Sequence, residues 1–358
     1  MSSLAWVDKS FIAAEVGFVS TIIVNSFLIY IIIFYTKQVF GAYKYLIVVF
    51  SLMGILFAAA EFLIKPMTHN YNVSFTFFSV SRPFGCSKDV ARVILAGYSS
   101  TYAATISLLA VQFIYRYWAI FHQRRVRHFN GFRFLIWIFF AMMFGIDWSS
   151  SVYFLGFPDD YSQEYLRSEI RQHYDLNISD LAHFSAVVYD GDMNFRWRSI
   201  GVMANVSKVM MVQYAVMIYC GTFMHRKMGE QLEKFSVKNQ KMHKQLFKTL
   251  VIQITVPTFT IFMPVMIMFM LPFFNLKLGL PTGIVLCALS LYPPMDGIIV
   301  ILIVSDYRKA SLGIIHNAVR RLTCNRVHLI PAQHMDITAS VTDKFSRNQR
   351  VSAYNSAF

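Results

Sequence analysis

The chain has 358 residues, of which 56% are hydrophobic and 15% are charged. This apolar excess, with a positive mean hydropathy, excludes an ordinary soluble domain. The net charge of +14 would suit nucleic acid, but the basic residues lie scattered between long uncharged runs, so no nucleic-acid partner is expected. The four cysteines are far apart and show no CxxC or Cys/His spacing, so no metal site, cofactor or disulfide framework is predicted.

Seven stretches are long and apolar enough to cross a membrane as helices, which takes ~20 residues for a ~30 Å hydrocarbon layer. None shows the polar face that a helix of a soluble protein requires. The sequence therefore predicts an all-α membrane protein, a seven-transmembrane helix bundle over residues 1–305. We expect the spans at about 11–35, 45–64, 90–118, 134–156, 199–224, 247–274 and 281–305.

The distribution of lysine and arginine predicts the orientation of the bundle. Twenty-one of these residues fall in segments 36–44, 121–133 and 225–248 and in the chain from 306 onward. The segments on the other side of the membrane, which are 1–10, 65–89, 157–198 and 275–280, hold nine. The long segment 157–198 is acid-rich. The amino terminus is therefore expected outside the cell and the carboxyl terminus in the cytoplasm.

Two glycosylation acceptor patterns agree with this orientation. Asn72 and Asn177 begin N-x-S sequons, and both lie in segments that the charge count places outside. A third sequon at Asn205 lies at the mouth of a span, where a glycan is not expected. No phosphate-binding loop, HExxH or GxSxG pattern occurs in the chain, so no enzymatic activity is predicted.

Residues 306–324 have apolar side chains at helical spacing together with flanking arginines, a pattern typical of an amphipathic helix on the inner membrane surface. Cys324 at its end is a candidate for palmitoylation, with a free thiol as an equal alternative. The tail 325–358 has few apolar runs and is expected to be disordered. The apolar positions of the expected helix are Leu312, Ile315, Val319 and Leu322.

Local motifs add a family resemblance to this architecture. They are GAYKYLIVVFS (41–51), EFLIKP (61–66), FIYRYWA (113–119), HKQLFKTLVIQITVPT (243–258), and LYPPMD followed by ILIVSDYRKA (291–310). In these motifs the chain resembles the nematode seven-transmembrane chemoreceptors of serpentine receptor class r, which include odorant receptors. The resemblance implies an olfactory G-protein-coupled receptor in the plasma membrane, at the sensory cilium of a chemosensory neuron. Its partners would be a small odorant, a heterotrimeric G protein and membrane lipid.

Two features depart from expectations for such receptors. Gly297 follows LYPPMD where relatives often continue with a further proline, and segment 157–198 has no cysteine to pair with Cys86. The order of that outer segment must therefore come from contacts other than a disulfide.

Residues for coupling and switching are expected at the cytoplasmic end and in the late helices. Arg116 resembles the arginine of the Asp-Arg-Tyr position in other receptors, with Tyr115 in place of the acid. The prolines and the lone aspartate suit a hinged helix that faces the bundle interior, and plain packing is an equal alternative. The candidates are Tyr115, Arg116, Tyr117, Pro257, Pro264, Pro293, Pro294 and Asp296.

The ligand pocket is expected among the outer halves of the helices, with mainly apolar and aromatic walls. The candidates are Tyr98, Thr101, Tyr102, Thr105, Phe262, Met266 and Phe269, for each of which helix packing is the competing explanation. Asp147 and Lys208 are the charged residues expected deep in this region, so a neutral ligand is favoured and Asp147 leaves an amine ligand as an alternative.

Two other function classes compete with the receptor. A transporter would show internal repeats and paired broken helices, but the proline breaks occur only late in the chain. An inverted seven-helix ligand-gated channel subunit would place the amino terminus inside, against the charge count and the two outer sequons.

Overall fold

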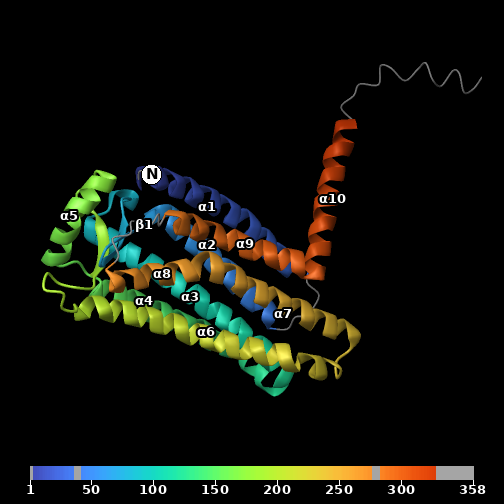
Figure 1. The fold of residues 1–358 in the computed structure, drawn as a ribbon. Helices are drawn as coiled ribbons and strands as arrows, with labels where there is room; N and C mark the ends of the chain where they lie inside the picture. Colours follow the sequence, from blue (N-terminus) through green and yellow to red (C-terminus); the bar gives the residue numbers. More distant parts are fainter. Residues whose placement is uncertain (1–2, 36–41, 276–282, 328–358) are drawn as a thin grey trace, which may run out of the picture. The chain divides into compact units, whose positions relative to one another are not determined.

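The computed structural model describes residues 3–35, 42–275 and 283–327, and the predicted seven-helix bundle is confirmed (Figure 1). The sixth membrane helix is a run of four segments that differ in helical winding. The membrane helices are α1 (Ser3–Phe34), α2 (Tyr43–Ile64), α3 (Lys88–Phe121), α4 (Phe134–Leu155), α6 (Trp197–Leu232), the run of α7 (Val237–Pro257), η6 (Thr258–Phe262), α8 (Met263–Met270) and η7 (Leu271–Phe274), and α9 (Gly283–Ile303).

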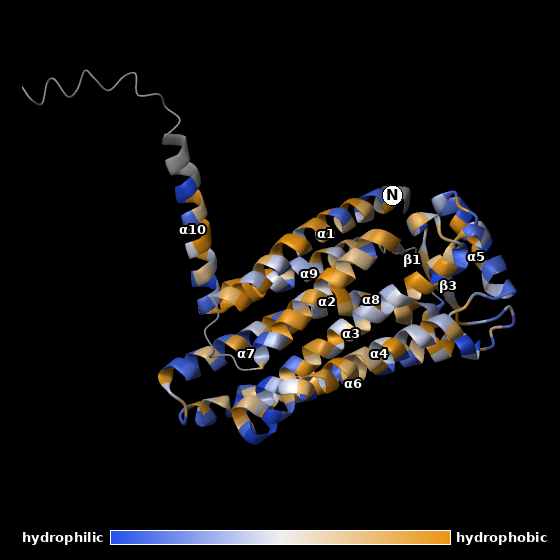
Figure 2. Cartoon of the chain, turned by 180° about the vertical axis from the view of Figure 1, so that it is seen from behind, coloured by the Kyte–Doolittle hydropathy of each residue, from blue (hydrophilic) through white to orange (hydrophobic). Residues whose placement is uncertain are grey.

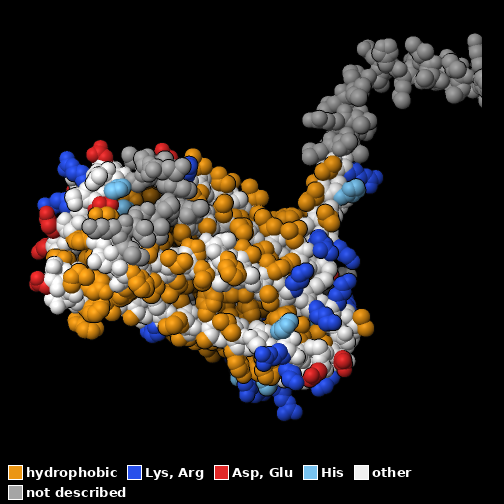
Figure 3. Space-filling model, viewed as in Figure 1, with side chains coloured by type: hydrophobic (Ala, Val, Ile, Leu, Met, Phe, Trp, Pro, Cys, Tyr) orange, Lys and Arg blue, Asp and Glu red, His pale blue; other side chains and the backbone are white. Residues whose placement is uncertain are grey.

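Helix α3 lies at the centre of the bundle, where it packs against α2, α4, α6 and α7. The other helices leave large apolar side chains uncovered by protein, among them Ile136, Phe139 and Ile218, each more than 60% exposed. Hydrophobic residues run along the middle of the helices (Figure 2). In the space-filling view, apolar side chains cover the middle of the molecule, and Lys and Arg gather toward the end where α6 and α7 meet (Figure 3). A belt of this kind fits the hydrocarbon of a bilayer.

The fifth and sixth membrane helices extend past the hydrocarbon on the cytoplasmic side. Helix α6 has 36 residues, and at ~1.5 Å per residue it is far longer than a ~30 Å layer requires.

Two short 3-10 helices, η3 (Gln123–Phe129) and η4 (Gly131–Arg133), connect α3 to α4.

A three-stranded antiparallel sheet covers the outer end of the bundle and was not predicted from the sequence. Strands β1 (Pro66–Tyr71) and β2 (Ser74–Ser79) form a hairpin, and β2 pairs in turn with β3 (Ala182–Val187). The tight turn of the hairpin places Asn72 at a φ of 50°, a conformation that asparagine tolerates better than most residues. The pairing of β2 with β3 joins the first outer loop to the second.

Helix α5 (Asp160–Tyr174) completes the outer layer, and its start is fixed by polar contacts. Asp159 caps the helix by accepting a hydrogen bond from the Ser162 backbone N–H at 2.9 Å, while the Ser162 hydroxyl accepts one from the Asp159 N–H at 3.0 Å. Arg196 forms an ion pair with Asp159. Together with the sheet, these contacts supply the order that the missing disulfide leaves to other interactions.

The chain divides after Arg308 into two units, the second of which runs from 309 onward. Helix α10 (Ser305–Val327) covers the predicted amphipathic segment, and Leu312, Ile315 and Val319 are each more than half exposed. Cys324 lies in this helix, but its side chain is outside the part of the chain that the structure describes. The tail 325–358 lies outside it too, apart from its first three residues, which end α10.

The outer layer contains a buried histidine that should make it sensitive to acid. His183 of β3 is 2% exposed, and burial lowers its pKa to about 4, a shift that the charges of Arg92 and Lys88 favour and a hydrogen bond to Leu181 opposes. Because the pKa of the unfolded side chain is ~6.5, the stability that neutral His183 contributes is complete above that pH. It is lost progressively as the pH falls toward 4.

We therefore predict that the melting temperature of the purified protein falls between pH 7 and pH 5, and that His183→Gln makes this dependence shallower. The largest slope that one such group can add is ~1.4 kcal/mol per pH unit. His225→Gln, at an exposed position of α6, is the matched control and should behave as the unmodified protein. Equal slopes for all three proteins would show that His183 does not govern the acid response.

Candidate ligand pocket and cytoplasmic coupling site

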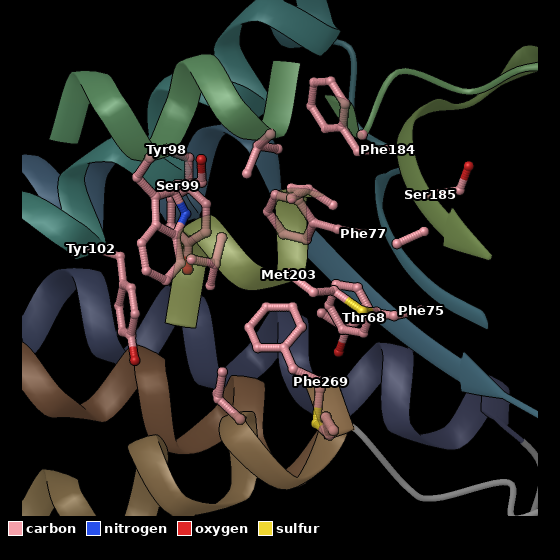
Figure 4. A pocket seen from close by; sticks show the side chains of 18 of the residues that line it. Thr68, Phe75, Phe77, Tyr98, Ser99, Tyr102, Phe184, Ser185, Met203 and Phe269 are labelled. Atoms are coloured by element: carbon pink, nitrogen blue, oxygen red, sulfur yellow. The ribbon is translucent and has the colours of Figure 1, made fainter. Parts of the chain in front are cut away.

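A cavity of about 130 Å³ lies where the sheet meets α3, α4, α6, α8 and α9 (Figure 4). The strands contribute Phe75, Phe77 and Phe184, and α3 contributes Tyr98 and Tyr102. None of the described residues that line the cavity is charged. The site therefore offers aromatic and aliphatic walls that suit a small apolar molecule.

Two hydroxyl groups in the wall of the cavity have no hydrogen-bond partner among the described residues. They belong to Tyr102 and Ser185, and both oxygens are buried. The Tyr102 ring is held in place by edge contacts with Trp148 and Phe262, at centroid distances of 5.7 and 5.8 Å. Ser185 alternates with Phe184 and Ala186 along β3, so its hydroxyl points to the other face of the sheet, away from the cavity (Figure 4). Because a buried unpaired hydroxyl costs roughly 1–3 kcal/mol, the Tyr102 hydroxyl would gain from a bound acceptor.

The predicted ligand residues fall into three groups. Tyr98, Tyr102 and Phe269 line the cavity. Thr105 and Phe262 line a second, smaller cavity of about 20 Å³, which Tyr102 also lines. Two of the predicted residues line neither cavity: Thr101, whose hydroxyl donates to the Tyr98 carbonyl at 2.7 Å, and Met266, which packs against the core.

The sequence analysis did not identify the strand residues that line the cavity. The stretches 74–79 and 182–187 are short and apolar, and SFTFFS has the alternation typical of a strand. That alternation was the available signal, but it does not reveal that 74–79 pairs with a segment more than a hundred residues away. The second outer loop therefore contributes Phe184 and Ser185 to a site expected to be formed by helices alone.

The expected position of the charged residues Asp147 and Lys208 in the ligand region is wrong. The two side chains are 47% and 58% exposed and form an ion pair across α4 and α6, with Nζ 3.4 Å from Oδ2. Asn205 also donates a hydrogen bond to the Asp147 carboxylate at 3.3 Å. Opposite charges on adjacent helices stabilise one another on the outer surface of the bundle, so the support that Asp147 gave to an amine ligand is removed.

A buried acid that the sequence analysis missed lies in α2 instead. Glu61 is 3% exposed and accepts a hydrogen bond from the Ser290 hydroxyl of α9 at 2.8 Å. It lies one turn from Phe57 and Ile64, which pack in the same cluster as Tyr98. Glu61 thus links α2 to α9 beside the cavity, although it does not line it.

Asp296 links α9 to α7 deeper in the bundle. It is 4% exposed, and its Oδ2 accepts a hydrogen bond from the Gln253 side-chain amide at 2.8 Å. Asp296 also lines the second cavity, together with Asn25 and Tyr102. The inward position expected for a membrane aspartate is therefore observed.

The prolines of the sixth and seventh helices have different local effects. Pro257 ends α7 and is followed directly by η6, a π-helical segment, and Pro264 lies in the first turn of α8. A proline removes one backbone hydrogen bond and crowds the preceding turn, which explains a change of winding at this point. Pro293 and Pro294, by contrast, lie inside α9, which continues through them as one helix.

Arg116 points into the cytoplasmic end of the bundle, where it is 3% exposed. Its guanidinium carbon lies 3.4 Å from the ring centre of Tyr43 in α2, and Tyr43 stacks on Tyr115 at 5.4 Å. The Tyr43 hydroxyl donates to the Gln112 side chain at 3.2 Å. Aromatic rings thus take the place of the acidic partner that the sequence lacks. The Nε and Nη2 atoms of Arg116 have no hydrogen-bond partner among the described residues.

Tyr117 lies on the other side of α3 from this ring cluster. Its ring makes edge contacts with Tyr219 and Phe223 of α6, at centroid distances of 6.1 and 5.4 Å. The three residues of the Tyr-Arg-Tyr motif therefore connect α3 to α2 on one side and to α6 on the other.

The two predicted glycosylation sites differ in their surroundings. The Asn72 side-chain nitrogen donates a hydrogen bond to the Tyr165 hydroxyl at 3.1 Å, and its Oδ1 is buried. Asn177 is exposed and accepts a hydrogen bond from Arg171 at 3.3 Å through its oxygen. The nitrogen to which a glycan would be attached is therefore engaged with a neighbour only at Asn72.

Comparison with known proteins assigns this architecture to a family. The family model for the serpentine type 7TM GPCR chemoreceptor Str matches residues 10–312. G-protein coupled receptor str-33 of Caenorhabditis elegans is 40% identical over 85% of this chain and 90% of its own length. Serpentine receptor class r-10 of the same organism is 31% identical, over 86% and 91% respectively.

Among solved structures, squid rhodopsin superposes with a TM-score of 0.59 at 13% sequence identity, and the match covers 96% of this chain and 91% of rhodopsin. At this identity the likeness shows the fold alone, a seven-helix receptor bundle. The family match and the 40% identical relative show more: the chain belongs to the serpentine seven-transmembrane G-protein-coupled chemoreceptors of the Str family.

Proposed function

We propose that this chemoreceptor is an olfactory receptor which binds a small neutral odorant in the cavity beneath the sheet and activates a heterotrimeric G protein. Members of its family are receptors and not enzymes. The observation that carries the proposal is the cavity itself, an uncharged aromatic pocket of about 130 Å³ at the outer end of the bundle. We propose further that the protein acts in the plasma membrane of a sensory cilium.

The volume and walls of the cavity favour a particular ligand class. Pockets for drug-sized molecules enclose roughly 300–1,000 Å³, so a cavity of about 130 Å³ suits a much smaller molecule. The apolar walls favour a neutral compound, and the unpartnered hydroxyl of Tyr102 favours one that carries a hydrogen-bond acceptor. An amine has no carboxylate to pair with among the described lining residues.

A chain of contacts leads from the cavity to the π-helical segment η6. Tyr102 touches Phe262 of η6, and Phe262 also makes an edge contact with Tyr214 of α6 at 5.3 Å. The hydroxyl groups of Tyr214 and Thr258 lie 3.0 Å apart. A ligand that moves the Tyr102 ring would therefore act on the segment next to Pro257, where the helix is weakest. This is a physical route for a hinge motion of α7.

At the cytoplasmic end, the contact between Arg116 and Tyr43 would hold the resting state. Motion of α7 strains its link to α9 through Gln253 and Asp296. Release of Arg116 from the ring would expose a cation to the G protein, whose own contacts then favour the active state. The basic side chains at the cytoplasmic ends of α6 and α7 would add to this docking surface.

Family membership removes the competing functions from consideration. Neither a transporter nor an inverted channel subunit is favoured by a specific feature of the described residues. We also propose that α10 attaches to the inner membrane surface through its apolar residues and that Cys324 is palmitoylated.

The ligand site is tested by Tyr102→Phe, which removes one hydroxyl and keeps the ring. We predict that the concentration of ketone or ester needed for half-maximal nucleotide exchange rises about tenfold, because one hydrogen bond contributes ~1 kcal/mol or slightly more. Thr101→Val is the matched control on the same helix. The assay compares ketones and esters with alkanes of equal length in cells that display each variant. A response to acceptor-bearing compounds that is unchanged in Tyr102→Phe would remove this hydroxyl from the site.

The coupling site is tested by Arg116→Ala and by two variants of its aromatic partner. Arg116→Ala should lower ligand-driven exchange while surface expression is kept, because the cation that contacts the G protein is lost. Tyr43→Leu should raise basal exchange about fivefold or more, since a desolvated cation–π contact is worth ~1–2 kcal/mol. Tyr43→Phe keeps the ring and should keep the basal rate. If Tyr43→Leu and Tyr43→Phe have the same basal rate, the ring does not restrain Arg116.

The accessible sequon is tested by deglycosylation of single variants. We predict that Asn177→Gln abolishes the shift in gel mobility that peptide N-glycosidase produces and that Asn72→Gln leaves it in place, because Asn177 is exposed, whereas Asn72 is half-buried and its amide nitrogen donates a hydrogen bond to Tyr165. A shift that survives in Asn177→Gln and disappears in Asn72→Gln would contradict this assignment.

A further inference from the structure

A groove of about 630 Å³ opens on the membrane-facing side of the bundle, between the cytoplasmic ends of α2 and α4. Both helices pack against α3, and the groove occupies the space between them. Its α2 side is formed by Lys44, Tyr45 and Val48, and its other side by Phe129 and Phe134. It is separate from the ligand cavity at the outer end and from the Arg116 site in the interior.

The groove is apolar along its length and polar at its cytoplasmic end. Tyr45 is 53% exposed, and its ring is in tilted contact with that of Phe134 at a centroid distance of 6.3 Å, so the two rings form a continuous apolar wall of the groove. Val48 lies one turn further into the membrane. Lys44 and Asn130 provide the polar end, and the Lys44 ammonium lies 4.9 Å from the Tyr45 ring centre. The shape and polarity therefore match an acyl chain with a headgroup at the membrane surface.

The charge around the polar end has one sign. Segments 36–44 and 121–133 carry six lysines and arginines and no aspartate or glutamate. Four of the six are exposed on the short helices and at the turn beside the groove: Arg124, Arg125, Arg127 and Arg133. A concentration of exposed cations at this depth attracts the anionic lipids of the inner leaflet.

We propose that this groove is a binding site for one anionic phospholipid of the inner leaflet, with the acyl chain along Tyr45, Val48 and Phe134 and the headgroup at Lys44. Charge complementarity selects this occupant over a zwitterionic lipid, which gains nothing from the surplus of cations. The apolar walls formed by Tyr45, Val48 and Phe134 select it over a soluble anion, which has no acyl chain to bury.

The groove lies one aromatic layer behind the coupling residues. Phe129, 1% exposed to solvent, stacks on Trp137 at 4.6 Å and makes an edge contact with Tyr115 at 4.9 Å. Tyr115 stacks in turn on Tyr43, the ring that faces Arg116. A lipid seated against Phe129 therefore contacts the outer side of the ring cluster that holds Arg116.

The position of Trp137 gives a direct measurement of lipid occupancy. The full-length protein is reconstituted in nanodiscs with increasing fractions of phosphatidylserine or phosphatidylcholine that carry bromine on an acyl chain, and tryptophan quenching is recorded. Trp137→Phe identifies the part of the signal that comes from this side chain. We expect half-maximal quenching of Trp137 at an about fivefold lower fraction of the serine lipid, the affinity that one surface lysine contributes toward an anionic headgroup.

Two charge variants decide whether the groove is responsible. Lys44→Gln should shift the phosphatidylserine curve toward that of phosphatidylcholine, with the remaining difference due to the neighbouring arginines, whereas Arg226→Gln, which removes an exposed charge from α6, should leave it unchanged. Val48→Phe fills the groove and should reduce quenching by both lipids. Equal quenching by the two lipids in the unmodified protein, or equal effects of Lys44→Gln and Arg226→Gln, would overturn the proposal.

Discussion

The pairing of β2 with β3 is the interaction on which the outer half of the molecule depends. It fixes the second outer loop over the bundle in a chain without a cysteine in that loop, by a ladder that runs from Ser74 opposite Val187 to Ser79 opposite Ala182. Backbone groups buried next to a membrane must find partners, and a sheet supplies them without help from side chains. The ladder also brings Phe77 opposite Phe184, and both line the ligand cavity. A single pairing therefore orders the loop and forms a wall of the pocket.

Three buried charged side chains of the bundle have neutral or aromatic partners, whereas buried Arg92 of α3 forms an ion pair with Asp89. Glu61 is bonded to a serine, Asp296 to a glutamine, and Arg116 lies over a tyrosine ring. A full ion pair would resist separation, whereas these partners can be exchanged at lower cost. Two of the three links join α9 to another helix, so α9 connects the region beside the ligand cavity to the hinge near Pro257. The aspartate of the LYPPMD stretch, Asp296, thus supplies one of the two bonds that join α9 to its neighbours.

The parts of the structure that follow from local physical requirements were predictable. A span needs an apolar run of fixed length, so the seven helices and their orientation could be predicted from the sequence alone, and an aspartate such as Asp296 had to face inward. The sheet could not be predicted in this way, because strands of six residues leave only a weak local pattern and their pairing joins distant segments. Spacing also could not decide which intramembrane charges face the interior: Glu61 was missed, and Asp147 was placed in the ligand region although it pairs with Lys208 on the outer surface. In each case the deciding factor is the rotation of a helix about its axis, which packing sets.

The most direct test of the account is a cryo-electron microscopy structure of the receptor with an active odorant and a G protein. The account predicts ligand density bounded by Phe77, Tyr102 and Phe184, with the Arg116 guanidinium moved off the Tyr43 ring toward the G protein. Ligand density outside the space between the sheet and α3, or Arg116 still stacked on Tyr43 in the active complex, would contradict it.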